Sequence, residues 1–158
     1  MRVGVDVGDA RIGVAVSDAP GIVVVPFETV PTHPLGRALK RIVSLVRERE
    51  AIEVVVGLPK NMGGDEGPAA QKARNFAQRL AVMAPDVRVC LIDERLSTVN
   101  AHSRLSTAGM SSRKHRNVVD QVAAQIILER ALDVEKTSGT LPGEAIAHTG
   151  NEKGSGLR

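Results

Sequence analysis

The stretch that decides the fold is RVGVDVGDARIGVAV, residues 2–16 at the beginning of the chain. Three valines alternate with small or polar residues up to Val7, and this period of two predicts a β-strand. Gly8 to Arg11 supplies turn residues, and the segment that follows alternates again, with Ile12 on one face and Gly13 on the other. The opening of the chain therefore predicts a β-hairpin.

Outward from this hairpin, hydrophobic periodicity predicts one further strand and then helices that alternate with strands. Short loops make the first three strands antiparallel, and crossover helices make the last two strands parallel. We therefore expect an α/β fold, with a mixed five-stranded sheet and helices on both faces. The expected strands after the hairpin are 22–30, 52–58 and 87–92, and the expected helices are 35–46, 69–83, 97–108 and 118–132, with a glycine-rich loop at 59–68.

The length of 158 residues suits one domain, which we place at residues 1–135. Residues 136–158 are rich in Gly, Ser, Thr and Glu and contain few apolar side chains. Such a segment buries too little surface to offset its ordering entropy, so we expect a disordered tail.

Composition narrows the class of protein. Aromatic residues make up only 1% of the chain, which excludes aromatic stacking platforms as the main means of binding nucleic acid, and the net charge of +3 favours an anionic partner weakly. The single Cys90 lies in an apolar run and is expected to be buried and inert. No stretch has the length of a membrane span or the pattern of a signal peptide, so we expect a cytoplasmic protein.

Asp6 is the first residue whose place in the sequence is not explained by the needs of folding. It lies in a valine-rich strand, where an uncompensated carboxylate costs several kcal/mol to desolvate. Membership of the following turn is an alternative, although Val7 intervenes and Asp9 suits the turn better. Asp6 is thus a candidate ligand for a cation.

Two further acidic positions qualify. Asp93 and Glu94 follow an apolar run at the carboxyl end of an expected parallel strand, where open α/β sheets place their sites, and alternation lets only one of them face the Asp6 side. Asp120 lies on the last helix, three and four residues before Ala123 and Ala124, so that this helix surface can approach a sheet closely. A first-turn acid at a helix dipole is the alternative for Asp120.

Three carboxylates that converge above one sheet would repel each other and require divalent cations. Ligation by oxygen atoms suits Mg²⁺ or Mn²⁺, and zinc motifs are absent from the sequence. Two such ions can activate a water molecule and stabilise the leaving oxygen in phosphodiester hydrolysis. The chemistry expected is that of a hydrolase, a metal-dependent nuclease.

A basic segment precedes Asp120. Residues 111–117 contain three fixed positive charges, from Arg113, Lys114 and Arg116, which are suited to phosphate contacts. A solvated loop between helices is the alternative interpretation.

Four motifs together resemble the YqgF/RuvX family of ribonuclease-H-like proteins, over about residues 2–133. Members are described as pre-16S ribosomal RNA nucleases and as Holliday-junction-resolvase-like proteins. Four motifs in one order are far more specific than any single one. They are DVGDARIGVA at 6–15, VGLPKNM at 56–62, DERLST at 93–98 and VDQVAA at 119–124.

The resemblance implies a ribonuclease-H-like fold and favours Glu94 over Asp93. It implies that the catalytic and metal-binding acids are Asp6, Glu94 and Asp120. It also suggests nucleic-acid contacts near Arg11, in the loop at 57–61 and in the DERLST motif. With the basic segment, the expected contact residues are Arg11, Lys60, Asn61, Arg95, Arg113, Lys114 and Arg116.

The expected function is 5′-end processing of pre-16S rRNA in ribosome biogenesis. Structured RNA is the first partner and ribosomal precursor particles are a further one. Resolution of branched DNA at Holliday junctions is the alternative, and would call for a homodimer rather than a monomer. Two alternatives of another class are a non-catalytic RNA-binding assembly factor and an actin-like ATP-binding hairpin, although 158 residues cannot hold the duplicated domains of an actin-like ATPase.

Overall fold

The computed structural model describes residues 1–94 and 112–147, with side chains in the second range from His115 onward. Three strands open the chain: β1 (Arg2–Val7), β2 (Arg11–Ser17) and β3 (Val24–Pro31). Each pairs antiparallel with the next, and Asp6 stands opposite Gly13 in the β1–β2 register. The predicted hairpin and antiparallel meander are confirmed.

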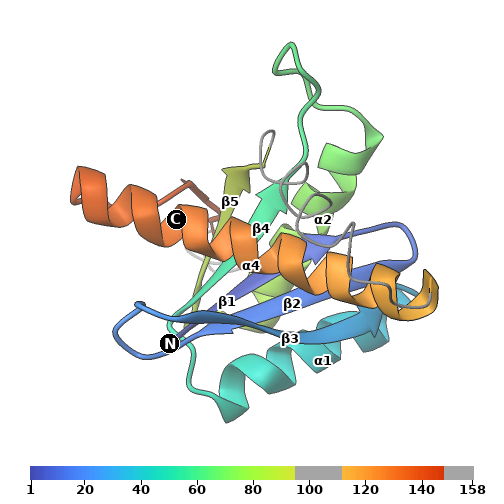
Figure 1. Ribbon diagram of the computed structural model, residues 1–158, viewed down its shortest axis with the longest axis horizontal. Helices are drawn as coiled ribbons and strands as arrows, with labels where there is room; N and C mark the ends of the chain where they lie inside the picture. The colour runs from blue at the N-terminus through green and yellow to red at the C-terminus, as the bar shows by residue number, and fades with distance from the viewer. Residues whose placement is uncertain (95–111, 148–158) are drawn as a thin grey trace, which may run out of the picture.

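Two parallel strands extend the sheet on the other side of β1. Strand β4 (Glu53–Leu58) pairs with β1, and β5 (Arg88–Asp93) pairs with β4, as the crossover argument predicts. Because β1, β4 and β5 run in the same direction, their carboxyl ends meet at one edge of the sheet (Figure 1). We call this the carboxyl edge.

A sixth strand corrects the expected count of five. Strand β6 (Glu144–Ala145) pairs antiparallel with β5, so that the sheet order is β3-β2-β1-β4-β5-β6. It lies in the segment 136–158 that we expected to be disordered; residues 148–158 are outside the described residues. The strand is held by backbone pairing and by Arg88, whose guanidinium donates to the carbonyl of Pro142. Such pairing leaves no apolar periodicity in the sequence.

Helices α1 (Leu35–Glu48) and α2 (Pro68–Met83) cover one face of the sheet. Their apolar stripes, with Leu39, Ile42 and Phe76 almost fully buried, pack against Val3 and Val5 of β1. These residues belong to the largest hydrophobic core among the described residues.

Helix α4 (Ser112–Ser138) crosses the opposite face (Figure 1). The sequence predicted only 118–132, because the apolar stripe covers just the part of the helix that lies on the sheet. The basic segment is helical from Ser112, so the alternative interpretation of it as a loop between helices is wrong. Asp120 lies in the third turn of this helix, so the first-turn alternative for Asp120 is also wrong. The helix expected at 97–108 is outside the described residues.

Two remaining expectations concern the core and membranes. Cys90 is fully buried, and burial, together with the carboxylate of Glu53, raises the pKa of its thiol to about 12, as expected of an inert cysteine. No helix in the described part of the chain is both long and apolar enough to traverse a bilayer.

Candidate active site

Strand alternation places Asp6 on the face of the sheet that α4 covers. Its neighbour Val5 is completely buried in the core beneath α1 and α2, so Asp6 points the other way. Gly4 and Gly13 lie on the same face as Asp6. Asp6 thus shares its face of the sheet with two residues that have no side chain.

These glycines bring Asp120 to the sheet. A Cβ atom at Gly13 would collide with the backbone carbonyl of Asp120, and one at Gly4 would lie 2.7 Å from the carbonyl oxygen of Ala124. Asp120 and Ala124 are four residues apart, so one helix face rests on both glycines. The small residues noted beside Asp120 in the sequence therefore allow the close approach that we predicted.

Hydrogen bonds to β3 fix the position of α4 along the sheet. The Thr29 hydroxyl donates to the carbonyl of Asn117 at 3.0 Å and accepts from the Gln121 amide at 3.0 Å. One turn further on, the Gln125 amide donates to the carbonyl of Val24 at 3.0 Å. Asn117 and Gln121 bracket Asp120, so these bonds hold the carboxylate in register with β1 and β2.

The structure distinguishes Glu94 from Asp93. A Cβ atom at Gly57 of β4 would collide with the Glu94 carboxylate and lie 2.5 Å from Ile127 of α4. Glu94 therefore lies on the α4 side of the sheet with Asp6, as the family resemblance implied. It is buried, with 9% of its surface exposed, and its backbone N–H donates to the carbonyl of Leu58 at 3.3 Å.

The three acids influence one another electrostatically. Burial, with a further contribution from the Asp120 carboxylate, raises the pKa of Asp6 to about 6. Burial, followed by repulsion from Asp6 and Asp93, raises the pKa of Glu94 to about 8. Among the described residues, Oε2 of Glu94 is buried without a hydrogen-bond partner. The three carboxylates thus lie on one side of the sheet in a partly buried site, and no ion pair joins Asp6 or Glu94 to a cationic side chain within residues 1–94 and 115–147.

Arg11 supplies positive charge on the other side. Its Nε donates to Oδ2 of Asp120 at 2.6 Å, and the Arg11 side chain is 34% exposed. In this conformation no three His, Cys, Asp or Glu side chains of the described residues are gathered closely enough to hold one ion. The donors nevertheless fit Mg²⁺ or Mn²⁺, because all are carboxylate oxygens and one is buried and unpartnered.

The predicted nucleic-acid contacts divide into three groups. Arg116 is exposed on α4, one turn before Asp120. Lys60 is partly buried and bridges Glu66 through its backbone, whereas the Asn61 side chain is occupied within its own turn. Arg95 and the side chains of Arg113 and Lys114 lie outside the described residues.

The comparisons with known proteins agree with this geometry. A sequence model described as "RuvX: Holliday junction resolvase" matches residues 1–134. The chain belongs to the RuvX family. Membership leaves the actin-like alternative without support.

RuvX-family relatives cover most of the chain. The protein named "Putative pre-16S rRNA nuclease" from Streptomyces avermitilis is 52% identical over 145 residues, which are 92% of this chain and 93% of the relative. A protein of the same name from Nocardioides sp. is 47% identical and covers 94% of this chain and 97% of its own length.

This RuvX-family chain has the same fold as a protein of known structure. It is the Thermus thermophilus RuvC in complex with Holliday junction substrate, with a TM-score of 0.57, 17% identity and coverage of 92% of this chain and 98% of RuvC. The ribonuclease-H-like fold predicted from the motifs is confirmed.

Sequence reasoning about this RuvX-family chain named Arg11 as a nucleic-acid contact but did not predict its ion pair with Asp120, nor the space that two glycines give to the acids. Gly57 gives space to Glu94 and Gly13 gives space to Asp120. The signal for Gly13 was present, since Gly13 and Ala15 place small residues on one face of β2 and the β-branched residues lie on the other. The ion pair between Arg11 and Asp120 joins residues 109 positions apart and has no local signal.

Proposed function

We propose that this protein, a nuclease of the RuvX family, hydrolyses phosphodiester bonds at the 5′ end of precursor 16S rRNA. In this proposal Asp6, Glu94 and Asp120 hold one or two divalent cations, Mg²⁺ or Mn²⁺. The site would lie at the carboxyl edge, between β1, the end of β5 and α4. Work on precursor rRNA would place the protein in the cytoplasm, on RNA or on ribosomal precursor particles.

The observation that carries the proposal is the convergence of three acids from distant parts of the chain on one side of the sheet. The Asp6 carboxylate lies close enough to Glu94 to oppose its ionisation, and the Asp120 carboxylate opposes ionisation of Asp6. A protein gains no stability from such an arrangement unless a cation neutralises it. The arrangement therefore favours a metal-binding catalytic site over a purely structural role.

Each residue has a separate task in this proposal. Bound divalent cations would supply an activated water and charge stabilisation at the leaving oxygen. Asp6 and Glu94 would hold that charge in a partly buried place, and Gly57 leaves room for the Glu94 carboxylate. Asp120 would close the site from α4, and Arg116 and Lys60 would attract the phosphate backbone.

RNA is proposed as the substrate because the relatives that span nearly the full length of the chain are named for pre-16S rRNA. The net charge of +3 agrees with an anionic polymer. No aromatic stacking platform is needed for contacts that are made mainly to phosphates.

Cleavage of a precursor 16S rRNA fragment by the wild type, beside Asp6→Asn and Glu94→Gln, tests the proposal. We expect cleavage that requires Mg²⁺ or Mn²⁺ and that falls at least about 100-fold in either variant, as for loss of a residue that holds the catalytic charge. Both variants remove charge from a repulsive cluster, so they should remain folded. Metal-independent cleavage, or full activity of both variants, would contradict the proposal.

A four-way DNA junction is the second candidate substrate. The family description names Holliday junction resolvase, and RuvC shares the fold. Symmetric cutting of a junction needs two active sites, so this activity would require a dimer. Cleavage of the junction but not of the RNA, by a dimer in solution, would favour this substrate.

A further inference from the structure

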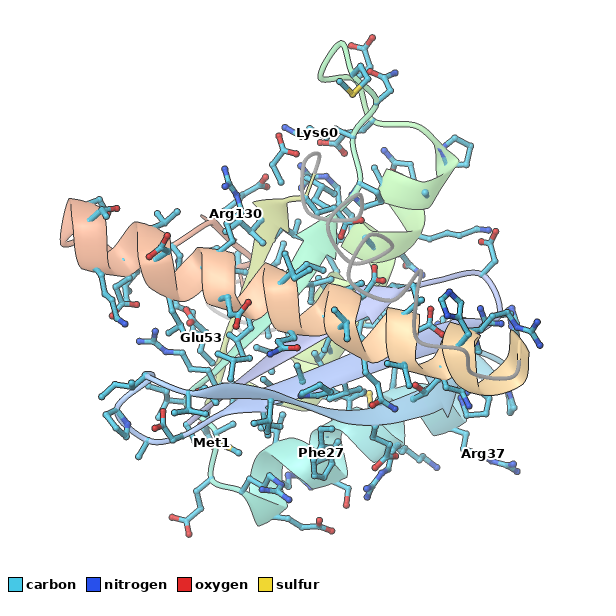
Figure 2. All side chains as sticks on the ribbon, viewed as in Figure 1. Met1, Phe27, Arg37, Glu53, Lys60 and Arg130 are labelled. Atoms are coloured by element: carbon cyan, nitrogen blue, oxygen red, sulfur yellow. The ribbon has the colours of Figure 1, made fainter. Side chains whose placement is uncertain are left out.

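The connection between β4 and α2, residues 59–67, projects beyond the carboxyl edge of the sheet (Figure 1). We call it the β4–α2 arm. It begins two residues after Gly57, which lies against the Glu94 carboxylate. Figure 2 shows Lys60 near the base of the arm. Nucleic acid bound at the three acids would therefore lie next to the arm.

Hydrogen bonds within the β4–α2 arm make its tip a defined turn. Oδ1 of Asn61 accepts from the backbone N–H groups of Gly63 and Asp65, each at 3.0 Å. The Asn61 N–H donates to the carbonyl of Asp65, and the Gly64 N–H donates to the carbonyl of Asn61, each at 2.9 Å. Gly64 has a φ of 90°, a conformation that favours glycine. The tip has a defined shape.

Charged groups anchor the base of the arm. The Arg74 guanidinium of α2 binds the Glu66 carboxylate through two hydrogen bonds of 2.7 and 2.8 Å. The same guanidinium binds Glu144 of β6 at 2.8 Å. Bidentate pairing fixes orientation as well as distance. The arm is thus held to a helix and to the edge of the sheet.

Met62 lies at the tip of the arm and is 81% exposed, the highest value among the described large apolar residues. Single exposed apolar residues are common on surfaces, so exposure alone carries no argument. Here the residue stands on an internally bonded projection whose base follows Gly57, the residue that lies against the Glu94 carboxylate. Both phenylalanines are engaged elsewhere, since Phe76 is buried and the Arg49 guanidinium covers the Phe27 ring at 4.4 Å.

We propose that Met62 is a wedge that inserts between two adjacent bases of the nucleic acid substrate near the cleaved bond. The inference rests on the proposed nuclease function and adds to it a substrate whose base stack is opened at one step. Apolar side chains presented to nucleic acid open base steps in this way, and the unbranched, polarisable side chain of methionine suits an irregular gap. Asn61 and Arg74 are then positioning residues, which hold the wedge rather than contact phosphate.

The test uses the full-length protein with Asp6→Asn, which keeps the RNA intact, and precursor 16S rRNA fragments. The fragments carry the fluorescent base 2-aminopurine at successive positions around the cleavage site. We expect binding to increase fluorescence at one or two adjacent positions only. Adding Met62→Ala should abolish this increase and weaken binding about fivefold or more, as for loss of a stacking contact. Met62→Leu should retain the increase.

Val82→Ala is the matched control. Val82 is an exposed apolar residue in the last turn of α2, far along the helix from the arm, and its loss should change neither fluorescence nor affinity. Since Met62 is exposed, Met62→Ala should leave the melting temperature unchanged.

The outcomes separate the wedge from the function on which it rests. RNA binding with no position-specific increase, or an increase that survives Met62→Ala, overturns the wedge and leaves the nuclease proposal intact. If the wild type neither binds nor cleaves the precursor RNA or the four-way junction, the nuclease proposal and the wedge both fail.

Discussion

The guanidinium of Arg11 lies 2.6 Å from the carboxylate of Asp120, so one of the three candidate metal ligands is already paired with a cation of the protein itself. Arg11 begins β2 and Asp120 lies on α4, and the close contact of that helix with Gly13 brings the two together. A divalent cation at the site would have to share Asp120 with Arg11 or displace it.

Arg11→Gln should therefore bind Mn²⁺ more tightly than the wild type does. The substitution removes a competing positive charge from Asp120, and we expect a gain of about three- to tenfold in affinity, equal to roughly 1 kcal/mol. Isothermal titration calorimetry measures it directly. Arg37→Gln is the control, because Arg37 is exposed on α1, across the sheet (Figure 2). Unchanged or weaker Mn²⁺ binding by Arg11→Gln would show that the ion pair does not compete with the metal.

The stability of the metal-free protein should fall as pH rises from about 4.5 to 8. The folded-state pKa of Glu94, about 8, lies above its ordinary value of 4.5, so within this window the folded protein binds more protons than the unfolded chain. The free energy of unfolding then decreases with pH, and Asp6, whose pKa is raised to about 6, adds to the decrease.

Melting temperatures in EDTA at pH 5, 6, 7 and 8 measure this dependence. Glu94→Gln should flatten it, because glutamine does not titrate. Glu48→Gln on the exposed end of α1 should leave the slope as in the wild type. A melting temperature that stays constant or rises across the range in the wild type would contradict the proximity of the acids.

Divalent cations should reverse this loss of stability. Binding to the folded state alone stabilises a protein by about 2.7 kcal/mol when the ligand is at 100 times its dissociation constant. We expect Mn²⁺ to raise the melting temperature by several degrees at pH 8 and by less at pH 5, where the acids are protonated. Asp6→Asn and Glu94→Gln should lose most of the shift. An equal shift in both variants would place the metal elsewhere.

Gly13→Ala should impair both the site and the fold. The added methyl group would meet the backbone of Asp120, so α4 must move away from the sheet. Overpacking of this kind costs about 1–3 kcal/mol, and displacement of Asp120 should reduce cleavage more than stability alone would predict.

Urea denaturation and cleavage rates, measured on the same preparations, test this prediction. Gly36→Ala is the matched control: Gly36 lies in α1 with nothing within 4 Å of an added Cβ atom. That substitution should stabilise the protein by up to ~1 kcal/mol and leave cleavage unchanged. Wild-type stability and activity in Gly13→Ala would mean that α4 does not depend on this contact.

Parts of this architecture are local properties and could be predicted from the sequence. The period of two in residues 2–16 determined the hairpin and the face on which Asp6 lies, because side chains of a strand alternate whatever surrounds them. The valine-rich setting of Asp6 marked it as a candidate ligand for the same local reason. The apolar stripes of α1 and α2 likewise predicted their positions to within a few residues.

Other parts depend on contacts between elements distant in the chain, and only the tertiary structure decided them. Glu94 rather than Asp93 joins Asp6 because its carboxylate lies over Gly57, and Asp120 reaches the same place because Gly13 lets α4 approach. Strand β6 and the polar ends of α4 carry no apolar period, since backbone pairing and helix turns beyond the sheet need none. A sequence records which side chains prefer burial, but the partner of an exposed or charged group is chosen by packing.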